Sequence, residues 1–173
     1  MTRKLFLPLA AIAFVGYSQA FATGTATSTF TTNAHIDSSC TMSVADLDFG
    51  AYDPFAAGAL TGKTDVTVTC TRGAVPTIAM DNGSHFNGSL RAMITGTGGA
   101  GNELSYELFQ PDAVGPSGAL TTVAWGSTGV NVFNAGSAPN KNARTVKLFG
   151  SIPAGQDSTV GTYADSVTAT VNF

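Results

Sequence analysis

The chain has 173 residues, of which 43% are hydrophobic and 11% are charged, and its formal net charge at pH 7 is −3. This length is sufficient for one domain with a hydrophobic core. The few basic residues form no dense cluster, which excludes the basic surface that nucleic-acid binding requires. Thr, Gly, Ala and Val are abundant while Leu, Glu and Lys are scarce, so the composition favours strands and turns over helices.

Residues 1–22 have the layout of a secretory signal peptide. Arg3 and Lys4 give a positive start, residues 5–15 are mostly apolar, and Ala20-Phe21-Ala22 is a small-x-small cleavage site. The apolar part is too short to span a bilayer. We therefore expect export and cleavage after Ala22, or two residues earlier; a buried N-terminal helix is the alternative.

The segment that follows, residues 23–36, alternates like a strand but is polar and almost uncharged. One face of this ribbon would carry Ala26, Ser28, Phe30, Thr32, Ala34 and Ile36. No turn signal follows that would fold the ribbon back on the domain. The N-terminal segment is therefore a potential strand that has no pairing partner in its own domain.

Two cysteines, Cys40 and Cys70, remain in the exported chain. Export to an oxidising compartment and an even cysteine count predict a disulfide between them. On the chain-entropy model, closing a loop of about thirty residues stabilises the fold by roughly 3–4 kcal/mol. Zinc binding and nucleophilic catalysis are weaker alternatives, because His35 and His85 stand in no ligand or catalytic pattern with the cysteines.

Strand-like segments then follow one another, separated by turn signals such as Asp81-Asn82-Gly83 and Asn87-Gly88. No window of twelve residues has a convincing helical period. This pattern predicts a single all-β domain, a β-sandwich in preference to a β-barrel. The expected strands are residues 65–70, 75–80, 90–94, 104–109, 120–125, 141–151 and 166–173.

The last of these segments, residues 166–173, is the strongest strand, with Val167, Ala169, Val171 and Phe173 on one face. Nothing follows it to pair with its edge, and an open edge is a hazard. Both features are explained if the N-terminal segment of one copy pairs, as an additional strand, with the open edge of residues 166–173 in the next copy. Because donor and acceptor surfaces differ, such a contact does not close and produces a fibre.

Residues that could carry chemistry are sparse. Asp46-x-Asp48-x-Gly50 resembles the start of a calcium loop but lacks the later ligands, so we interpret these as turn aspartates. Glu103 and Glu107 share a strand face, which fits either a glycosidase pair or, more often, the solvated face of a strand. Trp125 is expected in the core rather than on a sugar site. No catalytic, metal or cofactor site is predicted, and both histidines are expected at the surface.

Several short motifs, spread along the whole exported chain, are similar to those of a known protein family. They include Asp48-Phe49-Gly50-x-Tyr52, Leu104-x-Tyr106-x-Leu108-Phe109, Phe149-Gly150-x-Ile152-Pro153, and Tyr163-x-Asp165-x-Val167-x-x-x-Val171-x-Phe173. In their order and aromatic C-terminus they resemble the spore coat U domain family. That family includes the major subunits of archaic chaperone–usher pili.

The resemblance implies an incomplete immunoglobulin-like β-sandwich in residues 37–173 that lacks its final strand, with residues 23–36 as an N-terminal donor strand. It implies partners as well: a periplasmic chaperone, an outer-membrane usher, further copies of the chain, and tip and minor pilin subunits. The implied role is non-enzymatic, in a surface pilus that supports adhesion and biofilm formation after export to the periplasm. The alternatives are a secreted spore-coat or cell-coat protein, a monomeric lectin-like module and, on Glu103 and Glu107 alone, a hydrolase.

Overall fold

The structure is a computed structural model that describes residues 23–173, so the predicted signal peptide lies outside the described residues. The chain divides into an N-terminal unit that ends at His35 and a compact unit, Ile36–Phe173. Residues 23–39 are exposed and contain no regular secondary structure. In the described part of the chain, no helix is long and apolar enough to cross a membrane.

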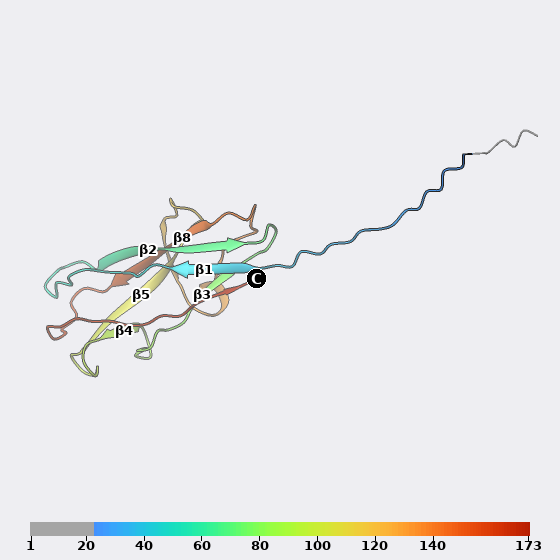
Figure 1. The fold of residues 1–173 in the computed structure, drawn as a ribbon. Helices are drawn as coiled ribbons and strands as arrows, with labels where there is room; N and C mark the ends of the chain where they lie inside the picture. Colours follow the sequence, from blue (N-terminus) through green and yellow to red (C-terminus); the bar gives the residue numbers. More distant parts are fainter. Residues whose placement is uncertain (1–22) are drawn as a thin grey trace, which may run out of the picture. The chain divides into compact units, whose positions relative to one another are not determined.

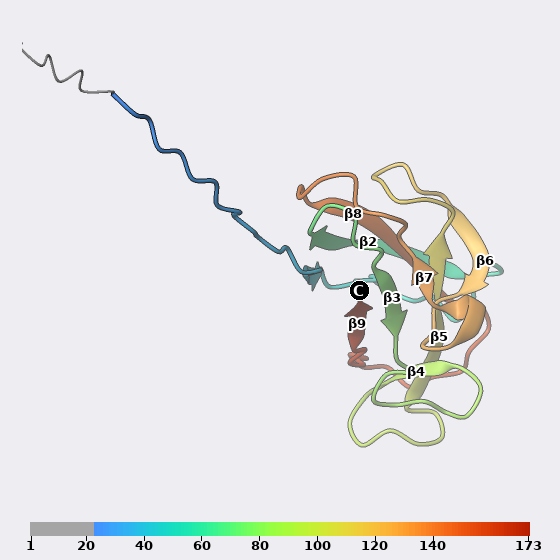
Figure 2. The same ribbon diagram turned by 90° about the vertical axis from the view of Figure 1, so that its right-hand side faces the viewer.

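The compact unit is built from two antiparallel sheets (Figures 1 and 2). The larger sheet follows the order β1 (Cys40–Val44), β2 (Leu60–Cys70), β8 (Arg144–Ile152), β5 (Glu103–Pro111) and β4 (Arg91–Ile94), and β6 (Leu120–Ala124) also pairs with β5. The smaller sheet contains β7 (Phe133–Asn134), β3 (Thr77–Met80) and β9 (Ala169–Asn172). A short 3-10 helix, η1 (Gly129–Asn131), precedes β7.

The core lies between the two sheets and is filled by the alternate residues of their strands. Val66, Val68 and Cys70 of β2 face Ile78 and Met80 of β3 across this core, and all are buried. Burial of such side chains is the main stabilising term of a sandwich. The alternation predicted from the sequence for residues 65–70 is therefore confirmed, and so is the all-β sandwich.

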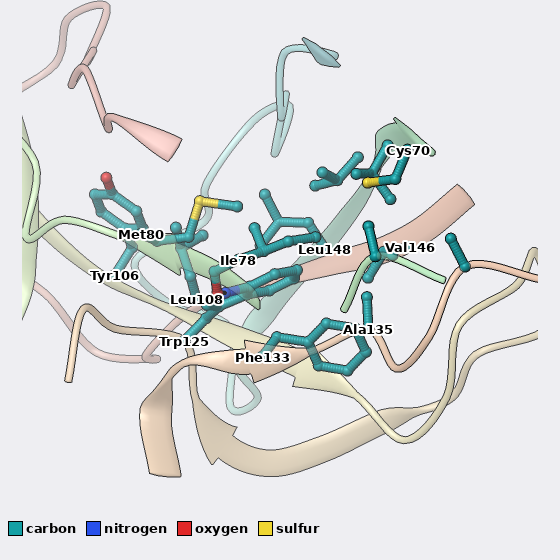
Figure 3. Packing of buried hydrophobic residues seen from close by; sticks show 14 of the residues in the cluster. Cys70, Ile78, Met80, Tyr106, Leu108, Trp125, Phe133, Ala135, Val146 and Leu148 are labelled. Atoms are coloured by element: carbon teal, nitrogen blue, oxygen red, sulfur yellow. Dashed lines mark hydrogen bonds between the residues drawn. The ribbon is translucent and has the colours of Figure 1, made fainter. Parts of the chain in front are cut away.

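Trp125 is fully buried at the centre of the core, as predicted (Figure 3). Its ring centroid lies 5.4 Å from that of Phe133. Its indole N–H donates a hydrogen bond to the carbonyl oxygen of Ile78 at 2.8 Å. A buried tryptophan needs such a partner for its only polar group, so Trp125 links the end of β6 to β3.

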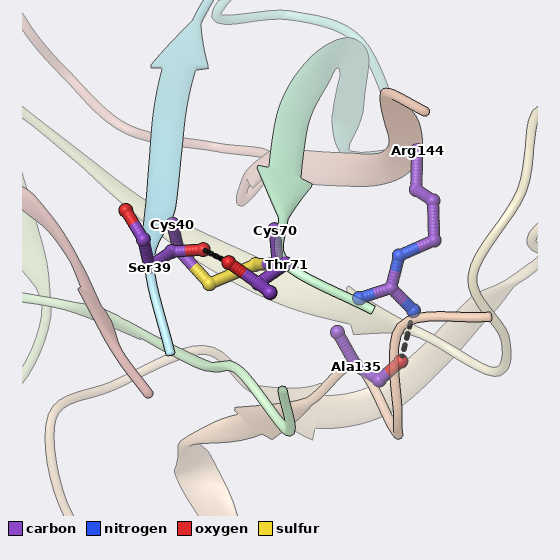
Figure 4. The surroundings of a disulfide bond; sticks show 6 residues. All are labelled: Ser39, Cys40, Cys70, Thr71, Ala135 and Arg144. Carbon is purple, nitrogen blue, oxygen red and sulfur yellow. Dashed lines mark hydrogen bonds between the residues drawn. A yellow bond between two sulfur atoms is a disulfide. The ribbon is translucent and has the colours of Figure 1, made fainter. Parts of the chain in front are cut away.

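The predicted disulfide between Cys40 and Cys70 is present and joins β1 to β2 (Figure 4). The two cysteines are direct cross-strand partners in the antiparallel ladder. Beside them, the Thr71 hydroxyl donates to the carbonyl oxygen of Ser39 at 3.4 Å. The bond therefore ties the first strand to the domain at the point where the N-terminal segment leaves it.

Several strands differ from the sequence expectations. β2 begins at Leu60, five residues earlier than expected, and β7 is absent from the expected strands. The first strand of the domain is β1, a short Cys-Thr-Met-Ser-Val segment that is absent from the expected strands. The last strand begins at Ala169 instead of residue 166. The residue before it, Thr168, donates its backbone N–H to the Asp81 carboxylate at 2.9 Å, so a side chain takes the place of the ladder bond there.

Candidate functional site

The sandwich leaves two neighbouring strand edges without a partner. Among the described residues, β1 pairs only with β2, and β9 pairs only with β3. The two strands contact each other, but they belong to different sheets and no ladder joins them. The space between them is therefore bounded on both sides by backbone that can bind one additional strand.

On β1, the alternation of hydrogen bonds shows which backbone groups face the open side. The Ser39 carbonyl accepts from Thr71 N at 2.8 Å, and Ala45 N donates to the Asp65 carbonyl at 3.1 Å. In an antiparallel pair these bonded positions alternate with non-bonded ones. The residues between them, Cys40, Met42 and Val44, therefore direct their N–H and C=O groups away from β2.

On β9 the same argument selects a second row of groups. Asp81 N donates to the Thr168 carbonyl at 3.0 Å, so Thr168 and, by alternation, Thr170 and Asn172 face β3. Val167, Ala169 and Val171 direct their backbone groups toward the open side. Their side chains are half-buried, as predicted for one strand face, whereas Phe173 is 55% exposed.

A groove runs between these two edges. Its main cavity has a volume of about 680 Å³ and lies between residues 42–49 and residues 163–169. The floor consists of core side chains, namely Met80, Met93, Tyr106, Leu108 and Leu148. A second cavity of about 580 Å³ shares Leu47, Phe49, Met93 and Tyr163 with the first and extends it past residues 158–162. The site is thus an elongated groove with a floor of core side chains and walls that include polar residues.

One wall of the groove rests on a pair of glycines for which the sequence offers no specific signal. Gly62 and Gly150 are cross-strand partners in β2 and β8. A Cβ atom on Gly150 would lie 2.5 Å from Cζ of Phe49 and 2.6 Å from Cδ2 of Leu47. The missing side chains therefore allow Leu47 and Phe49 to lie against the sheet, and Phe49 then contacts the Tyr106 ring edge-on at 6.1 Å.

A buried carboxylate fixes the other wall. The Asp165 side chain is 1% exposed, and its Oδ2 accepts a hydrogen bond from the Tyr106 hydroxyl at 2.7 Å. Its Oδ1 accepts from Ser84 N at 3.0 Å and lies 3.0 Å from Nδ1 of His85. Burial, together with the bond to Asp165, raises the pKa of Tyr106, so that the hydroxyl stays a donor. The His85 side chain contacts Asp165 but is still 38% exposed, and His35 is exposed, so both histidines lie at the surface as expected.

The two glutamates have separate roles. Glu107 forms an ion pair with the buried Arg91, whose guanidinium also donates to the carbonyl oxygens of Asp81 and Trp125. The interpretation of Glu107 as part of a solvated strand face is therefore wrong. Glu103 accepts from Gly99 N at 3.3 Å at the start of β5. The pair that could have suggested a glycosidase is structural.

The interpretation of the Asp48 segment as a turn agrees with its geometry, because Asp48 Oδ1 accepts a hydrogen bond from Gly50 N at 2.8 Å. Within the described part of the chain, no cluster of His, Cys, Asp and Glu could hold a metal ion. The groove is therefore the main candidate functional site.

The six predicted donor residues, Ala26, Ser28, Phe30, Thr32, Ala34 and Ile36, are all exposed. Phe30 is 87% exposed and Ile36 is 81% exposed. None of these residues belongs to a strand in the described chain. Their assignment as a donor strand remains a prediction, as does the assignment of Val167, Ala169, Val171 and Phe173 as the acceptor edge.

Comparison with known proteins agrees with this architecture. Protein U of Myxococcus xanthus is 27% identical over 180 residues, which cover 95% of this chain and 93% of that protein. The fold is similar, with a TM-score of 0.55 and 21% identity, to a chain in the crystal structure of the CsuC-CsuE chaperone-tip adhesion subunit pre-assembly complex from archaic chaperone-usher Csu pili of Acinetobacter baumannii. The match covers 79% of this chain but only 40% of that one. The Spore Coat Protein U domain matches residues 26–170, so the chain belongs to this family of structural, non-enzymatic proteins.

Proposed function

We propose that the protein is a structural subunit of a cell-surface pilus, or fimbria, that is assembled by donor-strand exchange through a chaperone–usher pathway. The observation that carries the proposal is the groove with two open strand edges, in a chain that also has an exposed, strand-like extension. A strand supplied by another copy would pair with β1 on one side and β9 on the other. Main-chain hydrogen bonds would give the affinity, and alternate side chains would enter the groove.

Phe30 is the main anchor of the proposed donor strand. It is the largest apolar side chain on the donor face, and it is almost fully exposed before assembly. Burial of one phenylalanine contributes about 1.5–3 kcal/mol. Each new backbone hydrogen bond adds about 0.5–1.5 kcal/mol, so pairing along both edges supplies the larger part of the binding free energy.

The chemistry of the connecting segment favours exchange between copies over insertion into the same domain. Ser39 already bonds to Thr71, so a return that placed Ile36 beside β1 of the same domain would need a turn within Asp37 and Ser38. Two-residue hairpin turns strongly prefer Asn-Gly, Asp-Gly or Gly-containing pairs, which supply a positive φ. Asp37-Ser38 lacks the glycine, and a donor from another copy needs no such turn.

The proposed partners follow from an open groove that must not aggregate before assembly. A periplasmic chaperone would cover the apolar floor after export, and an outer-membrane usher would exchange the chaperone for the next subunit. Tip and minor pilin subunits would complete a fibre that supports adhesion and biofilm formation at the cell surface. The Acinetobacter baumannii complex, in which a chaperone holds a tip adhesion subunit before assembly, supports this order of events by analogy.

A second candidate is a spore-coat or cell-coat protein, favoured by the match along nearly the full length of Protein U. The same strand exchange would then form a coat layer rather than a pilus. Electron microscopy of cells that express the chain and cells that lack it distinguishes the two. Thin fibres that disappear with the chain support the pilus, whereas a continuous surface layer supports the coat.

The strand exchange itself is tested with Phe30→Asp, which would place a charge in an apolar groove. We expect this variant to be exported with its disulfide intact but to form few or none of the heat- and detergent-resistant multimers of the unsubstituted chain. Val130→Asp is the matched control, because Val130 is 84% exposed in η1, away from the groove. Full multimer formation by Phe30→Asp would overturn the role of Phe30 and, with it, the proposed anchor of the exchange.

A further inference from the structure

The groove edge that ends in β9 is not one continuous strand. At Ala164 the chain pairs with Ile94, the last residue of β4 in the larger sheet, through two backbone hydrogen bonds of 3.0 and 3.1 Å. From Ala169 onward it pairs with β3 in the smaller sheet (Figure 2). Residues 165–168 therefore cross from one sheet to the other, and they belong to no strand. We call these four residues the crossing; they border the main cavity of the groove.

Hydrogen bonds to the loop that follows β3 hold the crossing where a ladder is missing. Thr168 N donates to the Asp81 carboxylate at 2.9 Å, and the Thr168 carbonyl accepts from Asp81 N at 3.0 Å. The Ser166 carbonyl accepts from Ser84 N at 3.0 Å. Ser166 and Thr168 thus face this loop, and by alternation Val167 directs its backbone groups toward the open side. Val167 is therefore the residue of the crossing that an added strand would meet.

Asp165 is the buried anchor of the crossing. Its side chain is 1% exposed, and its two oxygens accept hydrogen bonds from different parts of the fold. Oδ2 accepts from the Tyr106 hydroxyl, which belongs to β5 of the larger sheet, at 2.7 Å. Oδ1 accepts from Ser84 N at 3.0 Å and lies 3.0 Å from Nδ1 of His85, both in the loop that continues from the smaller sheet. One carboxylate therefore connects both sides at the point where the chain changes sheets.

The loop that follows β3 is shaped to receive this carboxylate. Gly83 has a φ of +77°, and a Cβ atom on it would lie 2.0 Å from Oδ2 of Asp165. Gly88, further along the same loop, has a φ of +92°, but a Cβ atom there would meet nothing within 4 Å. A positive φ explains both glycines, whereas only Gly83 is also required by the close approach of Asp165.

We propose that Asp165 is a positioning residue for strand capture. Together with Asp81 it holds residues 165–168 in one conformation across the change of sheet, so that Val167 presents its N–H and C=O groups to the incoming strand. The inference rests on the proposed strand exchange and assigns to it a device within the acceptor edge. A groove that is competent only part of the time binds more weakly, in proportion to that fraction.

The chemistry of Asp165 suits orientation better than packing. A buried apolar side chain at this position would stabilise the fold by non-directional burial. Hydrogen bonds depend on angle as well as distance, so bonds on both oxygens fix how the crossing lies. A pre-positioned edge lowers the ordering cost that the incoming strand must otherwise overcome. We therefore expect loss of the carboxylate to affect capture beyond its effect on stability.

The main test measures how fast a fluorescently labelled peptide of residues 25–36 binds to a host chain. The host is the full chain with Phe30→Asp, whose own extension is impaired as a donor. Asp165→Leu in this host should slow capture about tenfold, because the crossing loses its fixed conformation. Asp165→Asn should capture within about twofold of the host, since its amide accepts from Ser84 N and donates to the Tyr106 hydroxyl. A folded Asp165→Leu chain that captures the peptide as fast as the host would overturn the proposal.

A pair of glycine variants tests the same device with Asp165 unchanged. Gly83→Ala places a methyl group where the carboxylate lies, so it should displace Asp165 and slow capture about tenfold. Gly88→Ala is the matched control, because it has the strain of a positive φ without the collision. It should capture within about twofold of the host, again by the fraction of competent grooves. Equal rates for the two variants would overturn the proposal, also in the case that Asp165→Leu does not fold.

A third variant separates positioning from stability. Val146→Ala leaves a cavity in the buried core and lowers the stability measured by urea unfolding, but Val146 does not line the groove. It should therefore capture the peptide at the rate of the host. If Val146→Ala slows capture as much as Asp165→Leu does, capture follows global stability, and the positioning role is refuted.

The host alone separates this inference from the proposed function. If the peptide binds the host and all the variants equally fast, the strand exchange stands and only the role of Asp165 is refuted. If the peptide does not bind the host at all, the strand exchange fails and the positioning role fails with it.

Discussion

The strands at the centre of the larger sheet and the strands beside the groove differ in how many neighbours they have and in how deeply their inward side chains are buried. β2 and β8 each have neighbours on both sides, and their inward residues Val66, Val68, Val146 and Leu148 are buried. β1 and β9 each have one neighbour, and their inward residues are half-buried or, at Val44, exposed. Inward and outward side chains alternate in both regions, but the inward face is fully covered at the centre of the sheet and only partly covered beside the groove.

This difference indicates where stability and where binding are located. We call the centre of the larger sheet, with Trp125 and the β2–β8 ladder, the sealed region. It should set the global free energy of unfolding. The groove region should open more easily, because β1 and β9 each have a ladder partner on one side only. Four variants separate the two regions, from the largest expected effect to the smallest.

Trp125→Ala should cause the largest loss, because it removes the side chain at the centre of the sealed region. Truncation of a buried tryptophan lowers the free energy of unfolding by about 3–5 kcal/mol. The Ile78 carbonyl also loses its hydrogen-bond donor. Urea unfolding followed by circular dichroism measures the change. A loss below about 1 kcal/mol would show that the core is not organised around this residue.

Replacement of Cys40 and Cys70 together by Ser should lower the free energy of unfolding by roughly 3–4 kcal/mol on the chain-entropy model. The disulfide joins β1, one wall of the groove, to β2. We therefore expect hydrogen exchange to increase more in β1 than in β8. A uniform increase in both strands would contradict the special dependence of the groove wall on this bond.

Gly150→Ala should have a smaller effect, centred on the groove. The new methyl group would collide with Phe49 and Leu47, which must move away from the sheet. Such overpacking lowers the free energy of unfolding by about 1–3 kcal/mol, and multimer formation should fall with it. Gly58→Ala is the control, because a Cβ atom there meets nothing within 4 Å. Equal stability of the two variants would show that Leu47 and Phe49 do not depend on the glycine.

The smallest expected effect is a pH dependence at Asp81. Burial raises the pKa of this carboxyl, but hydrogen bonds from Thr168 N and Gly83 N outweigh it, so the pKa lies below its ordinary value of 3.8. The resulting stabilisation is present above the unfolded-state pKa and is lost as the pH falls through the lower folded-state pKa. Unfolding measured between neutral pH and pH below about 4 should show a smaller acid loss for Asp81→Asn. An unchanged acid loss would contradict the coupling of Asp81 to the start of β9.

The local features of the fold could be predicted from the sequence. The alternation in residues 65–70 and the cysteine pair follow from period and export alone, and both are confirmed. β1 could not be predicted, because its five residues mix polar and apolar types and gain their strand partner only through β2.

The groove depends on contacts between distant positions, which sequence patterns do not show. The Tyr106–Asp165 hydrogen bond joins residues 59 positions apart, and the packing of Phe49 requires Gly150. Glu107 looked solvated because its partner Arg91 lies on another strand. The sequence did indicate an unpaired strand-like segment at the N-terminus and an open strand edge at the C-terminus. That argument needs only the periodicity of the side chains and the order of the segments.

The central claim is that one strand from another copy pairs with β1 and β9. Hydrogen exchange of the backbone amides of the free chain and of the assembled multimers tests it most directly. We predict that Met42, Val44, Ala169 and Val171 exchange rapidly in the free chain and become strongly protected in multimers, together with residues 26–36. The amides of Val66 and Val146 should be protected in both states. Multimers in which the open-side amides of β1 and β9 still exchange rapidly would contradict the account.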